Sequence, residues 1–332
     1  MKLSLGKTKL TIKKDPWHRN HLIRDGILAA IYETMKIDPN VYILGEGAHM
    51  KVHFDAPKIE AEFPDRVITL PISEDANSNF AVGMSLAGLI PIVDVISSDF
   101  LYRTMDAICN TMAKAETVGD PRTMIIRSEF MTGGPTSGQR IEALFTHIPG
   151  LRVAVPSNPY DAYGLMRTAL ETKAVTIFFE DRMIEDASIP SGLTAYDEKK
   201  GEIHRLAGWD GARGVTSGSR ATVVSYGLTQ RVVEDTLANK NCTIIDLRML
   251  YPLDVEMVLA CVQENNKLLI VEPDVKFMGI GAELAAQVAE KLPGCKIKRL
   301  GAPRVTIPAS RDLHDAIMPS PEQILAAVEA FQ

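Results

Sequence analysis

Glu74 is a carboxylate at the junction between two different sequence patterns. Residues 66–70 alternate in the manner of a β-strand, and Pro71 ends that run. Small residues such as Ala81 and Gly83 then follow at spacings that suit a closely packed helix, so Glu74 lies at or just before a helix N-terminus. Taken alone, a carboxylate there is typical of a helix cap, favoured by the helix dipole. Buried beside an aromatic ring, it would have a raised pKa and could share a proton with a ligand.

Glu46 and Phe100 are two further candidates. Glu46 follows the Leu44-Gly45 pair at the end of a predicted strand, and Phe100 follows a predicted strand over residues 90–95. By themselves, a Glu in a Gly-flanked turn is typical of a solvated loop, and a Phe at a strand-to-helix junction is typical of a core residue.

Length and composition indicate two domains and exclude some classes of partner. The chain has 332 residues, of which 46% are hydrophobic, so it is longer than one typical domain and can bury substantial cores. Its net charge is −6, with 36 basic and 42 acidic residues and no long Lys/Arg cluster. These features argue against a nucleic-acid-binding or membrane-binding surface.

The cysteines and the hydropathy pattern predict a cytoplasmic protein. The four cysteines are too far apart for a CxxC metal or redox motif, and each lies in an apolar segment where reduced, buried cysteine is commonest. No apolar run is long enough to span a membrane, and no apolar stretch near the N-terminus suggests a secretory signal.

Strand-like and helix-like segments alternate along the chain, which predicts parallel sheets covered by helices. Predicted strands lie at 41–45, 66–70, 90–95, 123–126, 152–156 and 176–179, with helices at 24–35, 79–89, 100–115 and 158–171. Further strands are expected at 221–226, 242–246, 268–272 and 296–300. The expected fold is α/β, with a doubly wound parallel-sheet domain followed by a smaller α/β domain. We assign residues 1–19 to an N-terminal tail, 20–195 to the first domain, 196–218 to a linker and 219–332 to the second domain.

The order of short motifs resembles the β subunits of the thiamine-diphosphate-dependent 2-oxoacid dehydrogenases and, more loosely, the matching half of transketolases. The resemblance runs from about residue 20 to the C-terminus. No single motif is specific, but their order is. The matching segments include Arg24-Asp25, Leu44-Gly45-Glu46, Phe63-Pro64-Asp65-Arg66-Val67, Pro71-Ile72-Ser73-Glu74, Ala87-Gly88-Leu89-Ile90-Pro91, His147-Ile148-Pro149-Gly150-Leu151, Asp246-Leu247-Arg248 and Gly279-Ile280-Gly281-Ala282-Glu283.

The resemblance implies a role for each candidate residue. The two domains would be a transketolase-like pyrimidine-binding domain and a transketolase C-terminal-type domain. Glu74 matches the glutamate that bonds the pyrimidine ring of thiamine diphosphate and favours the imino tautomer, which removes the thiazolium proton. Phe100 matches the position whose ring packs on the aminopyrimidine, and Glu46 matches a glutamate that lines the same pocket.

One expected motif is missing, which implies a partner chain. Enzymes of this family hold the diphosphate through a divalent metal bound by a Gly-Asp-Gly segment and a later Asn, and this chain carries Gly119-Asp120-Pro121 instead. It would therefore contribute no metal ligand and bind only half of the cofactor. The resemblance implies an α subunit that holds magnesium and the diphosphate, in an α2β2 heterotetramer, with a lipoyl acyltransferase as a possible further partner.

A second departure concerns the acyl acceptor. Relatives carry a histidine about ten residues before the His-Ile-Pro-Gly segment that is thought to assist transfer to a lipoyl group; Ser137 stands there in this chain. His49 and His53, in the loop after Glu46, are candidates for a replacement. The potassium site of many relatives is also put in doubt by Lys173, whose charge would repel a cation.

Three functions remain open at this point. The first is the β subunit of an enzyme that decarboxylates a 2-oxoacid and passes on the acyl or aldehyde unit. The second is the C-terminal half of a split transketolase that transfers a two-carbon ketol unit. The third is a non-catalytic scaffold, supported by Ser137 and opposed by Glu74.

Overall fold

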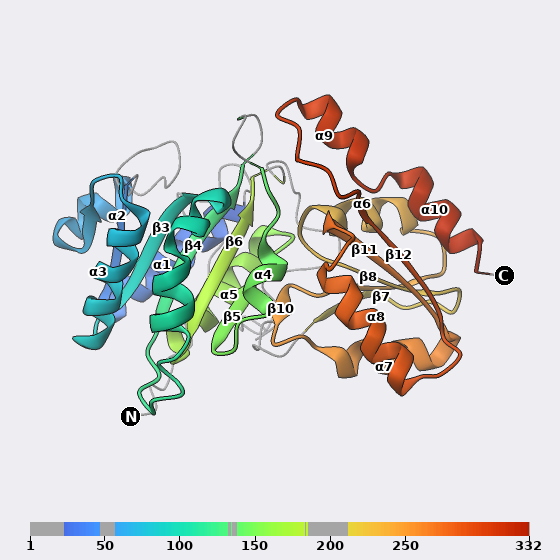
Figure 1. The fold of residues 1–332 in the computed structure, drawn as a ribbon, viewed down its shortest axis with the longest axis horizontal. Helices are drawn as coiled ribbons and strands as arrows, with labels where there is room; N and C mark the ends of the chain where they lie inside the picture. Colours follow the sequence, from blue (N-terminus) through green and yellow to red (C-terminus); the bar gives the residue numbers. More distant parts are fainter. Residues whose placement is uncertain are drawn as a thin grey trace, which may run out of the picture.

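The computed structural model describes residues 23–46, 57–131, 134, 138–182, 184 and 212–331. Two sheets lie side by side in it, each covered by helices, as Figure 1 shows. The expected α/β class, with a mostly parallel sheet covered on both faces followed by a smaller α/β domain, is confirmed. Within the described residues, no helix combines the length and the apolar character needed to cross a membrane.

The first sheet has seven strands. In spatial order they are β10 (Met249–Tyr251), β5 (Leu151–Ala154), β6 (Val175–Asp181), β4 (Met124–Phe130), β3 (Ile90–Ser97), β1 (Val41–Gly45) and β2 (Val67–Thr69). All neighbouring pairs are parallel except β10 and β5, which are antiparallel. The central strands β4 and β6 are buried along their whole length, as expected for a parallel sheet covered on both faces.

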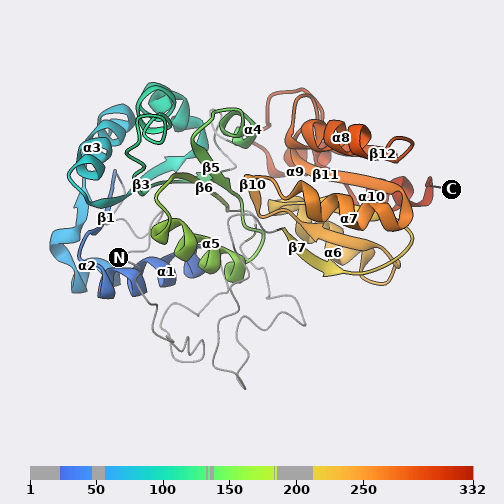
Figure 2. The same ribbon diagram turned by 90° about the horizontal axis from the view of Figure 1, so that it is seen from below.

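Helices cover both faces of this sheet (Figure 2). One face carries α1 (Ile23–Ile37) and α5 (Pro159–Glu171), which pack closely because Gly26 has no side chain: a Cβ there would lie 2.0 Å from the Pro159 carbonyl oxygen. The other face carries α3 (Glu74–Leu86), with α4 (Glu142–Thr146) beside β5. The short α2 (Pro57–Glu62) and the 3-10 turn Pro64–Arg66 precede β2.

The segment after β3 differs from the single helix predicted over residues 100–115. It consists of a 3-10 helix at Ser98–Thr104, named η3, and a π-helix at Ala107–Met112, named η4. The Thr104 hydroxyl donates to the Leu101 carbonyl at 2.9 Å, three residues back. The Ala113 amide donates to the Ile108 carbonyl at 2.9 Å, five residues back. The hydrophobic pattern predicted a helix here but not these tighter and wider turns.

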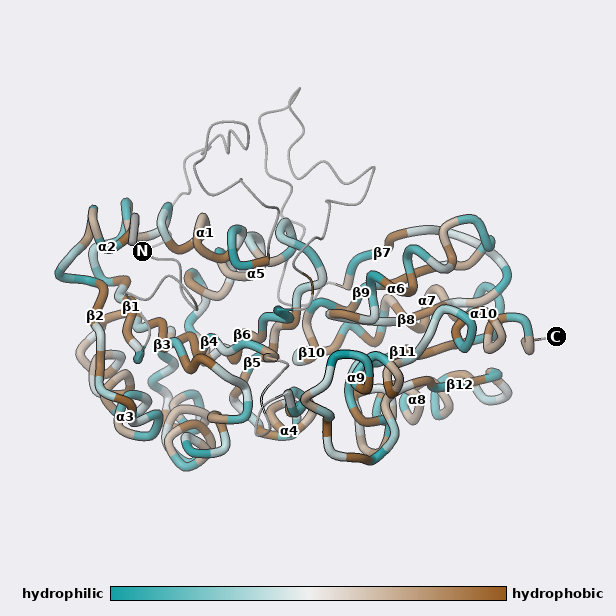
Figure 3. The backbone as a smooth tube through the Cα atoms, turned by 90° about the horizontal axis from the view of Figure 1, so that it is seen from above, coloured by the Kyte–Doolittle hydropathy of each residue, from teal (hydrophilic) through white to brown (hydrophobic). Residues whose placement is uncertain are grey.

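The second sheet has five strands. Their order is β12 (Lys296–Ala302), β11 (Lys267–Val275), β8 (Thr222–Ser225), β9 (Thr243–Asp246) and β7 (Arg213–Thr216), with only β7 antiparallel to its neighbour. Helices α6 (Gly227–Leu237) and α10 (Pro321–Glu329) pack together, as do α7 (Val255–Asn265) and α8 (Ile280–Lys291), while α9 (Arg311–Ile317) follows β12. Figure 3 shows hydrophobic residues along the inner strands of both sheets.

Two strands depart from the predicted organisation. β7 lies inside residues 196–218, the range assigned to a linker; it is only four residues long and includes Gly214, which hid the strand pattern. β10 comes from the second half of the chain but pairs with β5 in the first sheet. The two halves are therefore joined by backbone hydrogen bonds as well as by side-chain packing.

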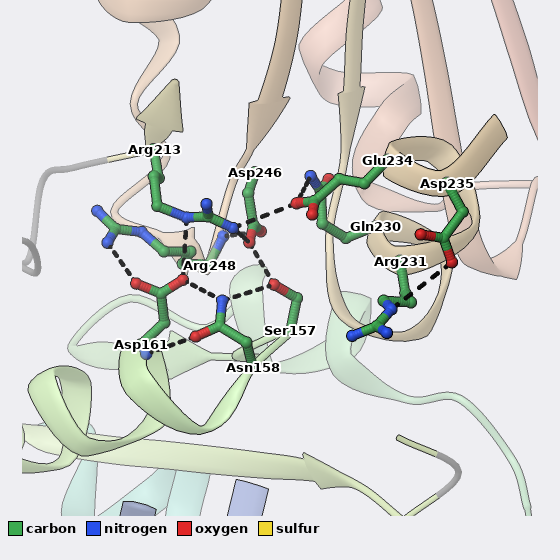
Figure 4. Close-up of polar contacts among 10 residues, drawn as sticks. All are labelled: Ser157, Asn158, Asp161, Arg213, Gln230, Arg231, Glu234, Asp235, Asp246 and Arg248. Carbon is green, nitrogen blue, oxygen red and sulfur yellow. Dashed lines mark hydrogen bonds and ion pairs between the residues drawn. The ribbon is translucent and has the colours of Figure 1, made fainter. Parts of the chain in front are cut away.

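A buried ionic network also joins the halves (Figure 4). The Arg213 guanidinium lies 3.0 Å from Asp161 on α5 and 3.0 Å from Asp246 at the end of β9. Arg248 bonds the other oxygen of Asp161 at 2.9 Å, and the Ser157 hydroxyl donates to Asp246. Burial raises the pKa of Asp246 to about 6, and the Arg213 charge opposes that shift.

Candidate functional site

The three candidate residues lie together at the carboxyl ends of strands in the first sheet. β1 pairs in parallel with both β2 and β3, so the carboxyl ends of these strands lie together. Glu46 follows β1, Glu74 begins α3 just after β2, and Phe100 follows β3. The structure thus brings all three to the edge where open α/β sheets bind ligands.

Glu74 is the first residue of α3 and is buried, with 7% of its surface exposed. Its Oε2 lies 3.3 Å from Nε of Arg103, whose side chain is 73% exposed. In the part of the chain that the structure describes, no α3 backbone amide donates to the Glu74 side chain, so it does not act as a hydrogen-bonded cap. Because the Arg103 side chain is mostly exposed to solvent, its ion pair with Glu74 is weak. A hydrogen-bond donor of a ligand can therefore replace Arg103 at little cost in free energy.

Glu46 is held against the start of α3. Its Oε1 accepts a hydrogen bond from the Ser73 amide at 2.8 Å and lies 3.5 Å from Nδ2 of Asn77, which also donates to the Pro71 carbonyl. Burial raises the pKa of the Glu46 carboxyl, and the nearby negative charge of Glu74 raises it further. Glu46 is therefore more easily protonated than an ordinary glutamate.

Phe100 lies in η3, which packs against α3. It is partly buried and packs against the large hydrophobic core that extends from the first sheet into the second. Arg103 follows it by three residues, one turn of the same 3-10 helix. The 3-10 helix η3 thus carries both Phe100 and Arg103, the residue that forms the ion pair with Glu74.

Sequence reasoning missed Arg103 and Asn77. Each carries a usable signal, because Arg103 lies one 3-10 turn after Phe100 and Asn77 lies three residues after Glu74, on the same side of a helix. Gly45 is also needed for the geometry: a Cβ there would lie 2.6 Å from the Asp94 carbonyl oxygen. Only glycine lets β1 approach β3 this closely, just before Glu46.

A buried charge cluster supports the same edge from inside the sheet. Arg127 on β4 lies 2.9 Å from Asp94 on β3 and 3.1 Å from Glu129, and it also contacts Glu180 on β6. Burial raises the pKa of the Glu129 carboxyl to about 7, with the Arg127 charge opposing the shift. Because Arg127 connects three adjacent strands, the cluster fixes the positions of the strand ends next to the candidate site.

The two glycine motifs lie away from this site. Asp120, in Gly119-Asp120-Pro121, forms an ion pair with Arg122 at 2.7 Å. It lies before the amino end of β4, whereas Glu74 lies at the carboxyl ends of the strands. The Gly281 amide at the start of α8 donates to the Glu272 carboxylate at 2.9 Å, so a side chain of the protein takes the position of a phosphate there. Among the described residues, no group of three or more His, Cys, Asp or Glu side chains is placed to hold a metal ion.

The remaining sequence candidates are only partly described. Ser137, His49 and His53 lie outside the described residues. His147 is exposed and is the C-cap residue of α4. Lys173 is exposed just after α5.

Comparison with known families and structures agrees with this geometry. Residues 22–184 match the transketolase pyrimidine-binding domain and residues 210–324 match the transketolase C-terminal domain. A solved structure described as "Split gene transketolase, inactive beta4 tetramer" has a TM-score of 0.76 and covers 93% of this chain and 97% of its own, at 17% identity. That likeness supports the fold.

Curated relatives align over nearly the whole chain. The β subunit of acetoin:2,6-dichlorophenolindophenol oxidoreductase from Cupriavidus necator is 32% identical, covering 92% of this chain and 95% of its own. The pyruvate dehydrogenase E1 β subunit of Porphyra purpurea is 30% identical over the same shares. The 2-oxoisovalerate dehydrogenase β subunit of Bacillus subtilis is 28% identical, covering 92% and 96%. The chain therefore belongs to the β-subunit family of the thiamine-diphosphate-dependent 2-oxoacid dehydrogenases, within the transketolase-like proteins.

Proposed function

We propose that this chain is the β subunit of a heteromeric enzyme that decarboxylates a 2-oxoacid and transfers the resulting acyl or aldehyde unit to an acceptor. The observation that carries the proposal is the buried Glu74 carboxylate at the carboxyl edge of the first sheet, beside Glu46 and between β2 and η3. Family membership supports the cofactor, since the relatives are β subunits of thiamine-diphosphate-dependent enzymes.

The residues at the edge fit the aminopyrimidine half of thiamine diphosphate. When bound, that cofactor supplies a carbon nucleophile that adds to the substrate carbonyl and stabilises the charge left by decarboxylation. In the proposal, Glu74 accepts a hydrogen bond from the pyrimidine ring and holds a proton there, and Phe100 packs against the ring face. Glu46, whose pKa is raised, is proposed to take up a proton beside Glu74 and so limit the negative charge of the pocket.

The proposal requires a second chain. Because Gly119-Asp120-Pro121 departs from the Gly-Asp-Gly segment that holds the metal in this family, we assign magnesium and the diphosphate to an α partner, in an α2β2 assembly. The α subunit implied by the names of the curated relatives supports this assignment. A lipoyl acyltransferase is proposed as a further partner for acyl transfer.

Replacement of Glu74 by Gln tests the role of its charge. With the partner chain present, Glu74→Gln should leave assembly intact and slow exchange of the cofactor's thiazolium proton for deuterium by about 10²- to 10⁴-fold. Asp75→Asn is the matched control, since Asp75 belongs to the same first turn of α3 and is exposed. Unchanged exchange in Glu74→Gln would return Glu74 to a structural role and remove the main support for catalysis.

A second donor class is an α-hydroxyketone, which the acetoin oxidoreductase relative supports. Turnover of the assembled enzyme on pyruvate, branched-chain 2-oxoacids and acetoin, with dichlorophenolindophenol as electron acceptor, identifies the donor.

Because Ser137 replaces the family histidine, we expect reductive acylation of a lipoyl domain to be slower than reduction of the dye. Fast lipoyl acylation would make this an ordinary dehydrogenase subunit in which another group, such as His49 or His53, replaces that histidine.

A further inference from the structure

An open pocket lies at the carboxyl ends of β11 and β12, beside the end of α9, well away from Glu74. Its volume is about 650 Å³, and small-molecule sites typically measure about 300 to 1,000 Å³. Figure 1 shows α9 above this end of the second sheet. The position is one where α/β sheets bind ligands, but none of the three candidate cofactor residues lines it.

The charge of the pocket is positive. Lys276, Arg299 and Arg304 line it, and no acidic side chain does. Arg299 is already engaged, with its guanidinium 2.7 Å from Glu272, while the second oxygen of Glu272 accepts the Gly281 amide. In the described part of the chain, no acidic side chain forms an ion pair with Lys276 or Arg304, so these two charges are available to a ligand.

An apolar wall adjoins the two cations. Phe277 is 64% exposed, and Ile317 and Met318 at the end of α9 complete the wall. The Arg304 guanidinium lies 5.4 Å from the centroid of the Phe277 ring. An exposed aromatic ring this close to a guanidinium suits a ligand that has both an apolar body and negative charge.

The backbone that presents these side chains is fixed. The Lys276 amide donates to the Ala302 carbonyl at 2.9 Å, and the Lys276 carbonyl accepts from Arg299 at 2.5 Å. Gly301 permits this close approach, since a Cβ there would lie 3.0 Å from Cγ of Glu272 and 3.1 Å from Cβ of Lys276. The backbone that carries Lys276 and Phe277 is therefore held in place by contacts within the protein.

We propose that this pocket binds a small organic anion that carries a phosphate, or two carboxylates, on an apolar or aromatic body. Two cations match a doubly charged group, and Phe277 with Met318 matches the body. The site goes beyond the proposed decarboxylation, because its residues belong to the second domain and none of the three candidate cofactor residues lines it.

Phenyl phosphate is a suitable probe, with inorganic phosphate and phenol as its two halves. Calorimetry on the purified chain and on the assembled enzyme should show saturable binding of phenyl phosphate, with Kd of about 10⁻⁴ to 10⁻³ M. Each half should bind at least about tenfold more weakly, because each lacks one of the two matched interactions. Added salt should weaken the binding of phenyl phosphate.

Variants assign the binding to these residues. The double change Lys276→Gln with Arg304→Gln should weaken phenyl phosphate at least about tenfold, and Phe277→Ala should weaken phenyl phosphate while leaving inorganic phosphate unchanged. Lys240→Gln, an exposed lysine at the opposite end of the second sheet, is the control and should change nothing. Absence of saturable binding, or equal binding by the double variant, would overturn the proposal. So would loss of binding on assembly, which would assign the pocket to a subunit contact.

Discussion

At the scale of single residues, the candidate site is defined by differences among its carboxylates. Glu74 is buried and paired with an exposed arginine, whereas Glu46 is bonded to the Ser73 amide and has a raised pKa. Farther inside the sheet, Glu129 is paired with Arg127, yet burial still raises its pKa to about 7. Burial thus raises the pKa of both Glu46 and Glu129, although the two carboxyls have different partners.

Because the pKa of Glu129 is raised in the folded state, its contribution to the stability of the fold should decrease as pH rises. Because the folded state holds this proton more tightly than the unfolded chain, the stabilisation is complete below the ordinary glutamate pKa of about 4.5 and is lost as pH rises through about 7. Glu129→Gln should therefore gain stability relative to the parent between about pH 5 and about pH 7.5, by about 1 to 3 kcal/mol.

Denaturant unfolding at the two pH values measures this gain, and Glu116→Gln is the control because Glu116 is exposed. Parallel pH profiles for the parent and Glu129→Gln would show that Arg127 keeps Glu129 ionised throughout.

At the scale of elements, the sequence predicted the parts that depend on local hydrophobic pattern. The strands β1, β8, β9 and β12 were placed within about two residues of their ends, as expected for buried β-branched runs. β7 and β10 were missed because they are four and three residues long and are stabilised by their partners β9 and β5.

In the candidate site, too, the sequence predicted some features and not others. The family motifs placed Glu46, Glu74 and Phe100 at strand ends, which the structure brings to one edge. The Arg103 contact depends on the direction of a 3-10 helix that the hydrophobic pattern did not predict. Contacts between distant elements, such as Arg127 with Asp94, have no local signal in the sequence.

The Arg213 network makes a prediction about how α5, β7 and β9 are joined. Arg213→Met leaves the buried Asp161 and Asp246 with less compensating charge and should destabilise the fold by about 3 to 5 kcal/mol. Arg231→Met is the matched control, because Arg231 on α6 pairs at 3.6 Å with the exposed Asp235 and should change stability by no more than about 1 kcal/mol (Figure 4).

Thermal and urea unfolding of the two variants provide the comparison. Equal, small effects would mean that Arg248 alone compensates the charge of Asp161.

At the scale of the whole molecule, large apolar side chains remain exposed near the candidate site. Ile72, two residues before Glu74, is 83% exposed, and Phe80 on α3 is 49% exposed. Large apolar side chains that remain exposed beside a polar site are typical of surfaces covered by another subunit.

We therefore expect the isolated chain to show no measurable binding of thiamine diphosphate with magnesium, and binding to appear when the α partner is added. Calorimetry on the purified chain, then on the mixture, checks this. Micromolar binding by the chain alone would mean that a metal and diphosphate site exists within it after all.

The pairing of β10 with β5 has a consequence for synthesis on the ribosome. Residues 249–251 emerge 95 positions after Ala154, the residue that Met249 faces across the sheet. At about 5 to 20 residues per second, β5 waits roughly 5 to 20 s as an open edge before its neighbour is made. An unpaired edge strand can pair with a strand from another nascent chain. Chaperones or a low growth temperature would therefore most improve the yield of soluble protein by acting during this interval.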